Sequence, residues 1–284
     1  MRWGFELELE KGLRTKKIWA LVAIVIILYL PMFYSMKQQT GITEKSVISL
    51  IISYTTQVSL FFLGIMAIVL GAGAFLKEME DGTIRIALSK PIKRIEYLLG
   101  KFGANFAIFM LIVFIMTAVT LIGLKWVGIN VGPVYSDVVI LNVLLGFVLV
   151  GFITIGYLMS LSLRSSGTAF GVALLVFFLL YLVLPGYVQY KAVSATSYSD
   201  TNSYTHIKDE YYTRYLFFAP NAQFNVILDN TMEIQNITEG VYGPVYVGLG
   251  HALKKTVVNV VLLVGMPFVY LGLAALRFKR VDLR

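Results

Sequence analysis

The chain has 284 residues, of which 58% are hydrophobic and only 14% are charged, and its mean hydropathy is +0.78. Soluble domains are about 45–50% apolar and about 25% charged, so this composition excludes a water-soluble globular enzyme and a disordered chain. The net charge of +8 indicates either a nucleic-acid partner or the topology of a membrane protein, in which basic residues collect on one side. The absence of cysteine excludes disulfides and thiolate chemistry.

Residues 1–17 are expected to form an amphipathic helix ahead of the first apolar segment. Apolar side chains alternate from Trp3 to Leu9 with the period of a strand, whereas Phe5, Leu9 and Leu13 fall on one face of a helix. We prefer the helix and expect it to lie in the membrane interface as a cytoplasmic elbow.

Six segments without Asp, Glu, Lys, Arg or His are long enough to cross a bilayer, which takes about 20 apolar residues in a helix. They are Ile18–Met36, Val47–Leu76, Phe102–Leu124, Val138–Leu163, Thr168–Tyr190 and Thr256–Leu276. The second is longer than a perpendicular crossing needs. We expect it to tilt, kink or extend past the membrane rather than to break into two spans, because no proline interrupts it. The sequence predicts an all-α membrane protein with one six-helix domain over residues 18–284.

Uncharged polar residues within the spans are candidates for a transport pathway. A polar side chain against lipid is costly, so such residues are expected to face protein, water or cargo. Close packing between helices explains them equally well. The candidates are Ser53, Thr56, Gln57, Asn142 and Asn259. Because no span carries a charge, the sequence argues against a secondary transporter driven by a titrating group within the membrane.

The connection 77–101, between the second and third spans, combines turn and helix signals. Asp81-Gly82 predicts a turn, Ile84 and Leu88 give a short helix one apolar edge, and Pro91 redirects the chain. Such a helix fits a groove on a soluble partner. A solvated, lipid-covered loop without a partner is an equally simple interpretation of the residues alone.

The connection 191–255, between the fifth and sixth spans, is expected to form a folded external cap with membrane-hugging helices anchored by interfacial tyrosines. Pro220-Asn221, followed by Phe224 and Leu228, predicts a short capped helix. Asn236 begins a glycosylation acceptor pattern, which matters only in an organism that glycosylates on that side.

The charges assign an orientation to the spans. Connections 1–17, 77–101, 164–167 and 277–284 together carry a net charge of +8, and the remaining connections sum to zero. Positive charge accumulates on the cytoplasmic side, so both termini are expected in the cytoplasm. The positive charge therefore reflects the orientation of the chain in the membrane, and no nucleic-acid partner is expected.

Sequence motifs for catalysis are absent. There is no phosphate-binding G-x-x-x-x-G-K-[ST] loop, no H-E-x-x-H and no G-x-S-x-G. The two histidines, His206 and His251, lie far apart in the outer connection and are expected to be lone surface residues rather than metal ligands. The chain is expected to be a non-enzyme without metal or cofactor.

The first cytoplasmic connection resembles that of the ABC-2 type family of ABC-transporter permeases. The matching residues are Glu78, Glu80, Gly82, Thr83, Leu88, Pro91, Arg94, Gly100 and Lys101. The N-terminal elbow, the short loop Arg164-Ser165-Ser166 and the basic tail Phe278–Leu283 also resemble that family.

The resemblance implies a plasma-membrane permease subunit of an ATP-driven exporter. Two ATPase subunits would bind ATP and magnesium, and they would act on two permeases that are identical or paralogous. The short loop helix would be the coupling helix. The coupling residues implied are Glu78, Glu80, Gly82, Thr83, Pro91 and Arg94. The cargo stays open among peptides, lipids, drugs and glycans. The alternative is an ATPase-independent channel or a membrane scaffold protein.

Overall fold

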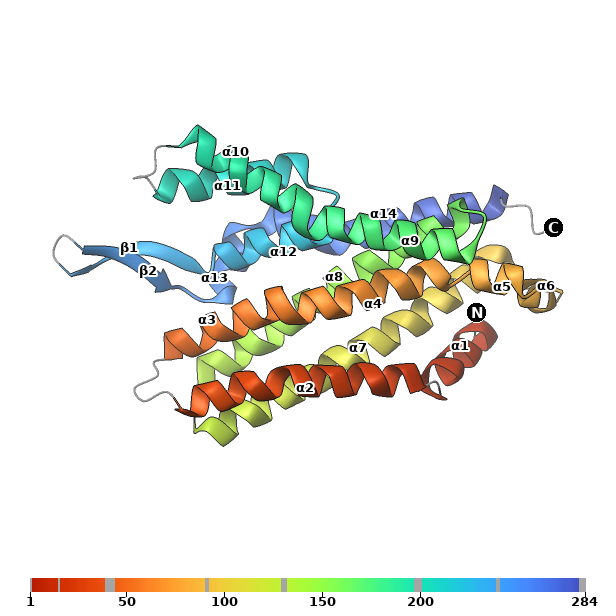
Figure 1. The fold of residues 1–284 in the computed structure, drawn as a ribbon, viewed down its shortest axis with the longest axis horizontal. Coiled ribbons are helices and arrows are strands. Elements are labelled where there is room, and N and C mark those ends of the chain that lie inside the picture. The colour runs from red at the N-terminus through yellow and green to blue at the C-terminus, as the bar shows by residue number, and fades with distance from the viewer. Residues whose placement is uncertain are drawn as a thin grey trace.

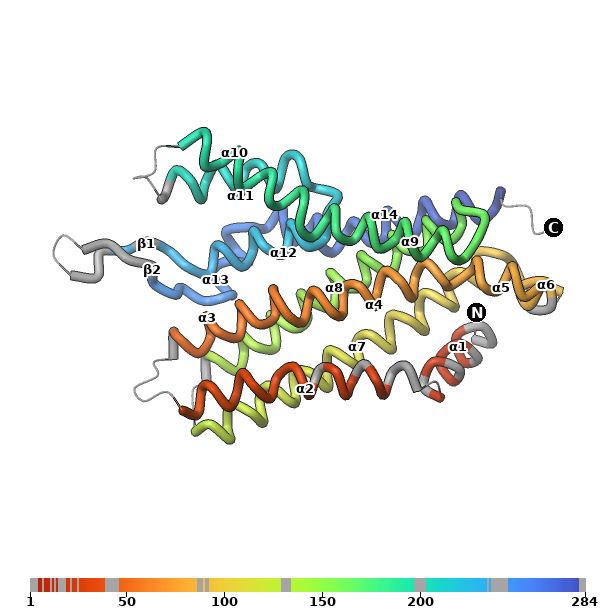
Figure 2. The backbone as a smooth tube through the Cα atoms, in the orientation of Figure 1, coloured from red at the N-terminus to blue at the C-terminus, as the bar shows by residue number. Residues whose placement is uncertain are grey.

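The computed structural model describes residues 2–14, 16–38, 44–89, 92–128, 132–196, 201–238 and 241–280. Most of them form helices that run along one long axis, with a two-stranded hairpin at one end (Figures 1 and 2). The elements are α1 (Arg2–Arg14), α2 (Lys16–Gln38), α3 (Glu44–Tyr54), η1 (Thr55–Ser59), α4 (Leu60–Gly73), α5 (Leu76–Glu80), α6 (Thr83–Leu88), α7 (Arg94–Val127), α8 (Gly132–Ser162), α9 (Ser166–Phe178), η2 (Leu179–Val183), α10 (Leu184–Ala195), α11 (Thr201–Tyr215), α12 (Pro220–Asp229), β1 (Met232–Thr238), β2 (Val241–Tyr246), α13 (Leu249–Lys255) and α14 (Val257–Arg280).

Within the described part of the chain, five helical runs are long and apolar enough to cross a membrane. They are Ser46–Glu80, Arg94–Val127, Val134–Ser162, Ser166–Ala195 and Val257–Arg280. They match the second to sixth predicted spans, and the second is one run rather than two, as expected. The first predicted span falls in α2, whose residues 22–38 form a shorter apolar helix.

The two sets of connections lie at opposite ends of the bundle (Figure 1). We call the end with α1, α5, α6 and the end of α14 the terminal end, and the opposite end the hairpin end. The terminal end contains the connections that carry the net positive charge. The end of α2, the start of α3 and the strands β1 and β2 lie at the hairpin end.

Helix α8 is the centre of the bundle and packs against α4, α7, α9 and α14. Glycines let α4 and α8 approach each other closely. A Cβ atom on Gly156 would lie 2.5 Å from the backbone oxygen of Ile68, and a Cβ atom on Gly71 would clash with the backbone of Ile153. Small residues are the usual means of close helix contact in a membrane, where lipid is as apolar as the side chains.

Two short π-helical segments, η1 and η2, interrupt neighbouring α-helices and are joined by hydrogen bonds. The Tyr181 hydroxyl in η2 donates to the backbone oxygens of Thr56 (3.0 Å) and Gln57 (3.2 Å) in η1. The backbone oxygen of Leu180 in η2 accepts from Nδ2 of Asn221 at 2.8 Å. A π-turn frees carbonyl groups from the helical pattern, and these side chains satisfy them where no water is available.

Helices α11 and α12 form a re-entrant pair that reaches the middle of the bundle. A Cβ atom on Gly151, about one turn past the midpoint of α8, would lie 2.6 Å from the Pro220 ring at the start of α12. Tyr270, near the middle of α14, donates its hydroxyl to the backbone oxygen of Phe218. The short helix predicted at Pro220 is confirmed, whereas its depth was not foreseen.

The β1–β2 hairpin was not predicted from the sequence. Its strands pair antiparallel, with Met232 opposite Tyr246 and an irregularity between Asn236 and Thr238. Tyr246 donates its hydroxyl to Oδ2 of Asp137 at 2.6 Å, which ties the hairpin to α8.

Candidate functional site

The α5–α6 segment, residues 76–88, projects from the terminal end of the bundle (Figure 1). The chain leaves α4 at Phe75 and Leu76, whose backbone N–H groups both donate to Oγ of Ser160 in α8, at 3.0 and 2.9 Å. Gly82 then takes a positive φ of 69°, which only glycine adopts without strain, and α6 begins at Thr83. The turn predicted at Asp81-Gly82 is confirmed.

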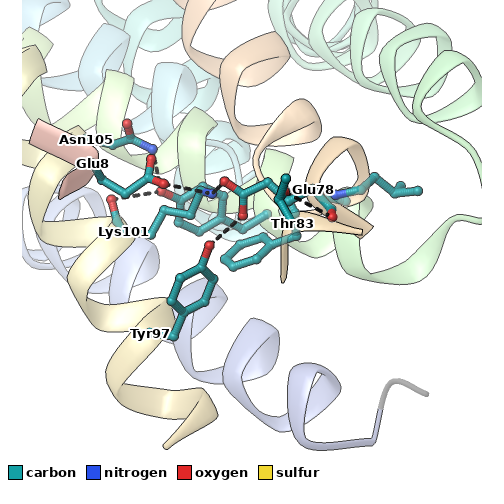
Figure 3. A network of polar contacts seen from close by, with 10 residues as sticks. Glu8, Glu78, Thr83, Tyr97, Lys101 and Asn105 are labelled. Atoms are coloured by element: carbon teal, nitrogen blue, oxygen red, sulfur yellow. Dashed lines mark hydrogen bonds and ion pairs between the residues drawn. The ribbon is translucent and has the colours of Figure 1, made fainter. Parts of the chain in front are cut away.

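Glu78 is the anchor of this segment (Figure 3). Its Oε1 accepts from the ammonium group of Lys101 at 2.6 Å, and its Oε2 accepts from the hydroxyl of Tyr97 at 2.6 Å. Glu8 of α1 lies 3.5 Å from the same ammonium group. Lys101 is only 4% exposed, so one buried cation joins α1, α5 and α7.

Aromatic rings surround the buried Lys101 ammonium group. It lies 5.3 Å from the ring centre of Phe75 and 5.6 Å from that of Tyr97. Cation–π contacts of this kind stabilise a cation that has lost its water. Phe75 also packs against Tyr157 of α8 and Phe278 of α14, with ring centres 5.1 and 5.3 Å apart. The anchor of the α5–α6 segment is thereby packed against four helices of the bundle.

Two further coupling candidates make contacts between separate connections. Oε1 of Glu80 accepts from the backbone N–H of Ser166 at 2.7 Å, at the first turn of α9. A carboxylate at the start of a helix is favoured by the helix dipole. The Arg94 guanidinium donates to the backbone oxygens of Phe278 (3.2 Å) and Lys279 (3.3 Å), at the end of α14.

The outer face of the α5–α6 segment is polar and exposed. Its exposed side chains are Lys77, Glu80, Asp81, Thr83 and Arg85. Ile84, by contrast, is 1% exposed and holds α6 against the bundle. The segment therefore offers charged groups to a partner while its Ile84 side chain stays in the core.

Of the coupling candidates, Glu78, Glu80, Gly82, Thr83 and Arg94 all lie in or beside this segment. Pro91 lies outside the described residues. Sequence reasoning missed Tyr97, Glu8 and Ser160 as partners. Their contacts link residues far apart in the sequence, so no local sequence pattern predicts them.

The pathway candidates occupy two kinds of environment. Ser53 and Gln57 are exposed on one helical run, and Thr56 is half-buried with its hydroxyl donating to the backbone of its own helix. Asn142 is 1% exposed, and its amide donates to the Thr117 hydroxyl at 3.0 Å. The Asn142 contact joins α7 to α8.

Asn259, the remaining pathway candidate, belongs to a buried amide cluster near the re-entrant pair. Its Nδ2 lies 2.8 Å from Oγ1 of Thr213 and 2.7 Å from Oε1 of Gln223. Nε2 of Gln223 donates to the backbone oxygen of Leu216 at 2.8 Å. Asn259 also lines a cavity of about 780 Å³ between α11, α12, β1 and the start of α14.

Charged groups of both signs line this cavity. Burial, with the nearby Asp229 carboxylate, raises the pKa of Asp209 to about 6. Oδ2 of Asp209 accepts from the Asn230 amide at 2.7 Å, while its buried Oδ1 has no hydrogen-bond partner. At the rim, the hydrogen bond from Lys255 lowers the pKa of Glu233.

No group of three or more His, Cys, Asp or Glu side chains that could hold a metal ion occurs among the described residues. The arrangement is instead that of a multi-pass membrane protein, with five long apolar helical runs among the described residues. A family model described as ABC-2 family transporter protein matches residues 3–283, and the chain belongs to that family. A search of curated proteins gave no match.

Proposed function

We propose that this protein is the permease subunit of an ATP-driven exporter in the plasma membrane, carrying an amphipathic or hydrophobic cargo outward. Membership of the ABC-2 family, whose members generally work with an ABC ATPase, supports this proposal. Two permeases, identical or paralogous, combine with two ATPase subunits, and those subunits bind ATP and magnesium.

In the proposed topology the chain crosses the membrane six times, with α2 as the first span and both termini in the cytoplasm. Helix α1 is the interfacial elbow, and residues 191–255 form the external cap. The positive charge of the connections at the terminal end supports this orientation. Because the chain contains no cysteine, single cysteines test it directly. Lys93→Cys is expected to react only with cytoplasmic reagent and Gln235→Cys only with external reagent.

The observation that carries the proposal is the attachment of the exposed α5–α6 segment to the bundle through Lys101. A partner that moves this segment pulls on Glu78, and Glu78 is bound to Lys101 and Tyr97 of α7. Glu80 passes the same displacement to the start of α9 through Ser166. A push at the terminal end thus reaches the spans as rigid-body motion, which is how packed helices transmit force.

Exposed polar groups support a pathway between two copies of the permease. Gln57 and Ser53 are exposed on an otherwise apolar run, which is unfavourable against lipid. A second permease with cargo between the two copies satisfies them. Asn142 and Asn259 are the deeper members of the proposed pathway.

Co-purification with the ATPase subunit tests the coupling role. Lys77→Glu with Asp81→Lys exchanges two exposed charges of the segment and keeps the net charge. Mismatched charges at an interface cost several kcal/mol, so recovery of the ATPase is expected to fall by about tenfold or more. The matched control exchanges Glu10 and Arg14, an exposed pair 2.7 Å apart in α1, and is expected to leave recovery unchanged.

Equal recovery of the ATPase with both exchanged variants would contradict the proposed docking surface. Transport by reconstituted vesicles that contain the permease and no ATPase would instead support the channel alternative. A scaffold role predicts no transport under either condition.

A further inference from the structure

A second cavity, of about 510 Å³, lies between α10 and α11. Its volume is within the range of about 300–1,000 Å³ that is typical of small-ligand sites. It is lined by Leu184, Tyr187, Val188, Lys191, Tyr211, Tyr215, Leu216 and Phe218. We call it the tyrosine cleft. None of the pathway or coupling residues lines it.

Polarity changes along the tyrosine cleft. Its deep end is apolar, because Leu184 begins α10 and Phe218 lies at the turn of the re-entrant pair, in the middle of the bundle. Lys191 lies two turns after Leu184 in α10, a rise of about 10 Å. Helix α10 runs toward the hairpin end (Figure 1). Tyr187 lies between Leu184 and Lys191 in α10, and Tyr211 and Tyr215 belong to the last two turns of α11. Of the residues that line the cleft, Lys191 alone carries a charge.

The cleft has exposed aromatic side chains over a buried floor. Tyr187 and Tyr215 are each 57% exposed, while Val188 and Leu216 form a floor that is 4% and 3% exposed. The Lys191 ammonium group lies 5.8 Å from the ring centre of Tyr187, so it is held at the rim. An apolar slot with an aromatic wall and a cation at its outer end matches the order of groups in a lipid leaflet.

We propose that the tyrosine cleft binds one acyl chain of an anionic phospholipid, whose phosphate pairs with Lys191. The acyl chain supplies apolar contacts to the side chains that line the cleft, and the tyrosine hydroxyls lie near the glycerol region of the lipid. A positive side chain at a membrane surface attracts anionic lipid with a strength of about 1 kcal/mol, or about fivefold. This lipid site is independent of the coupling to an ATPase. In the proposed orientation the cleft faces the external leaflet, and this assignment alone rests on the proposed function.

Photo-crosslinking of the full chain in vesicles tests the site. The probe is phosphatidylglycerol with a photoreactive group near the end of one acyl chain, diluted in phosphatidylcholine. Labelled peptides are expected to contain residues 184–188 and 215–218, at several times the yield given by photoreactive phosphatidylcholine. Lys191→Glu is expected to lower the phosphatidylglycerol yield by about fivefold or more. Lys254→Glu, an exposed lysine of α13 outside the cleft, is the matched control and is expected to keep the yield.

Aromatic variants test the wall of the cleft without changing charge. Tyr187→Ala with Tyr215→Ala is expected to lower labelling by both lipids, whereas Tyr190→Ala, which is 67% exposed and outside the cleft, is expected to leave it unchanged. Equal labelling by the two lipids, or equal labelling of the wild type and Lys191→Glu, would overturn the proposal. So would a crosslink between two copies of the chain through the cleft, or full displacement of the lipid by inorganic phosphate alone. Lys191→Gln replaces Lys191→Glu if the latter fails to fold, and the same loss of headgroup preference is expected.

Discussion

Removal of the Lys101 ammonium group is expected to be among the most damaging single changes at the terminal end of the bundle. Lys101→Met keeps the length of the aliphatic stem but removes the ammonium group, which leaves the carboxylates of Glu78 and Glu8 without their shared cation. The side chains of these glutamates are 12% and 19% exposed, so water compensates for the loss only in part. Breaking a buried ion pair from one side costs about 3–5 kcal/mol.

The magnitude follows from the burial of the three groups. The side chain of Lys101 is 5% exposed, and Glu78 is 2.6 Å from it, so the lower end of the range, about 3 kcal/mol, is a fair expectation at the edge of the bundle. A loss of that size lowers the melting temperature by about 6 °C or more in a domain of this scale. Thermal unfolding of the purified protein in detergent measures it.

A double-mutant cycle separates the ion pair from the packing of the lysine stem. Glu78→Gln keeps an oxygen that accepts from Tyr97 and removes the charge, so Lys101→Met combined with Glu78→Gln is expected to be less damaging than the sum of the two single changes. Lys77→Met, on the exposed side of the same segment, is the control. The reasoning is refuted if Lys101→Met shifts the melting temperature no more than Lys77→Met does, or if the two changes are additive.

Three further predictions concern other parts of the molecule. Gly71→Ala is expected to destabilise the fold by about 1–3 kcal/mol, because the new Cβ atom meets the backbone of Ile153, while Gly171→Ala meets open space and serves as control; thermal unfolding compares them. Tyr181→Phe leaves the freed carbonyls of Thr56 and Gln57 without that donor and is expected to cost about 1 kcal/mol, measured against Tyr187→Phe; equal melting temperatures would argue against a role for this link. The raised pKa of Asp209 means that its protonated form stabilises the fold, so this contribution is full below pH 3.8 and is lost as pH rises through about 6. Asp209→Asn is expected to flatten that slope in melting curves taken across the pH range, and an unchanged slope would assign it to other groups.

The spans were predictable because a run of apolar residues without charge has few other stable environments. The turn at Gly82 was equally predictable, because glycine adopts the positive φ that such a turn requires. Helix α12 was found from its proline and its apolar edge, but not its depth. Its polar residues Asn221 and Gln223 suggest a surface helix until their partners on η2 and α14 are known.

Other features depend on contacts that no local pattern encodes. The π-helical segments arise within long continuous helices, one in the polar stretch Thr55–Ser59 and one in the apolar stretch Leu179–Val183, and only the donor from Tyr181 shows why the carbonyls of η1 are left accessible. Lys101 pairs with Glu8, although the first two spans separate these residues in the sequence. The hairpin was missed although Met232–Tyr246 contains alternating apolar and polar residues with a central glycine, because the connection 191–255 was expected to form a cap of membrane-hugging helices.

The amide cluster of the re-entrant pair imposes an order on the assembly of the protein. Asn259 lies in the last span, and it binds Thr213 and Gln223, which are synthesised well before it. Until α14 enters the membrane, the amide of Gln223 lacks this partner in an apolar setting, where an unsatisfied polar group costs several kcal/mol. Helix α12 therefore completes its docking only when synthesis of the chain is almost finished. A chain that stops before α14 leaves Oε1 of Gln223 without its donor from Asn259, although Nε2 of Gln223 still has its acceptor, and this unpaired oxygen distinguishes incomplete copies from finished ones.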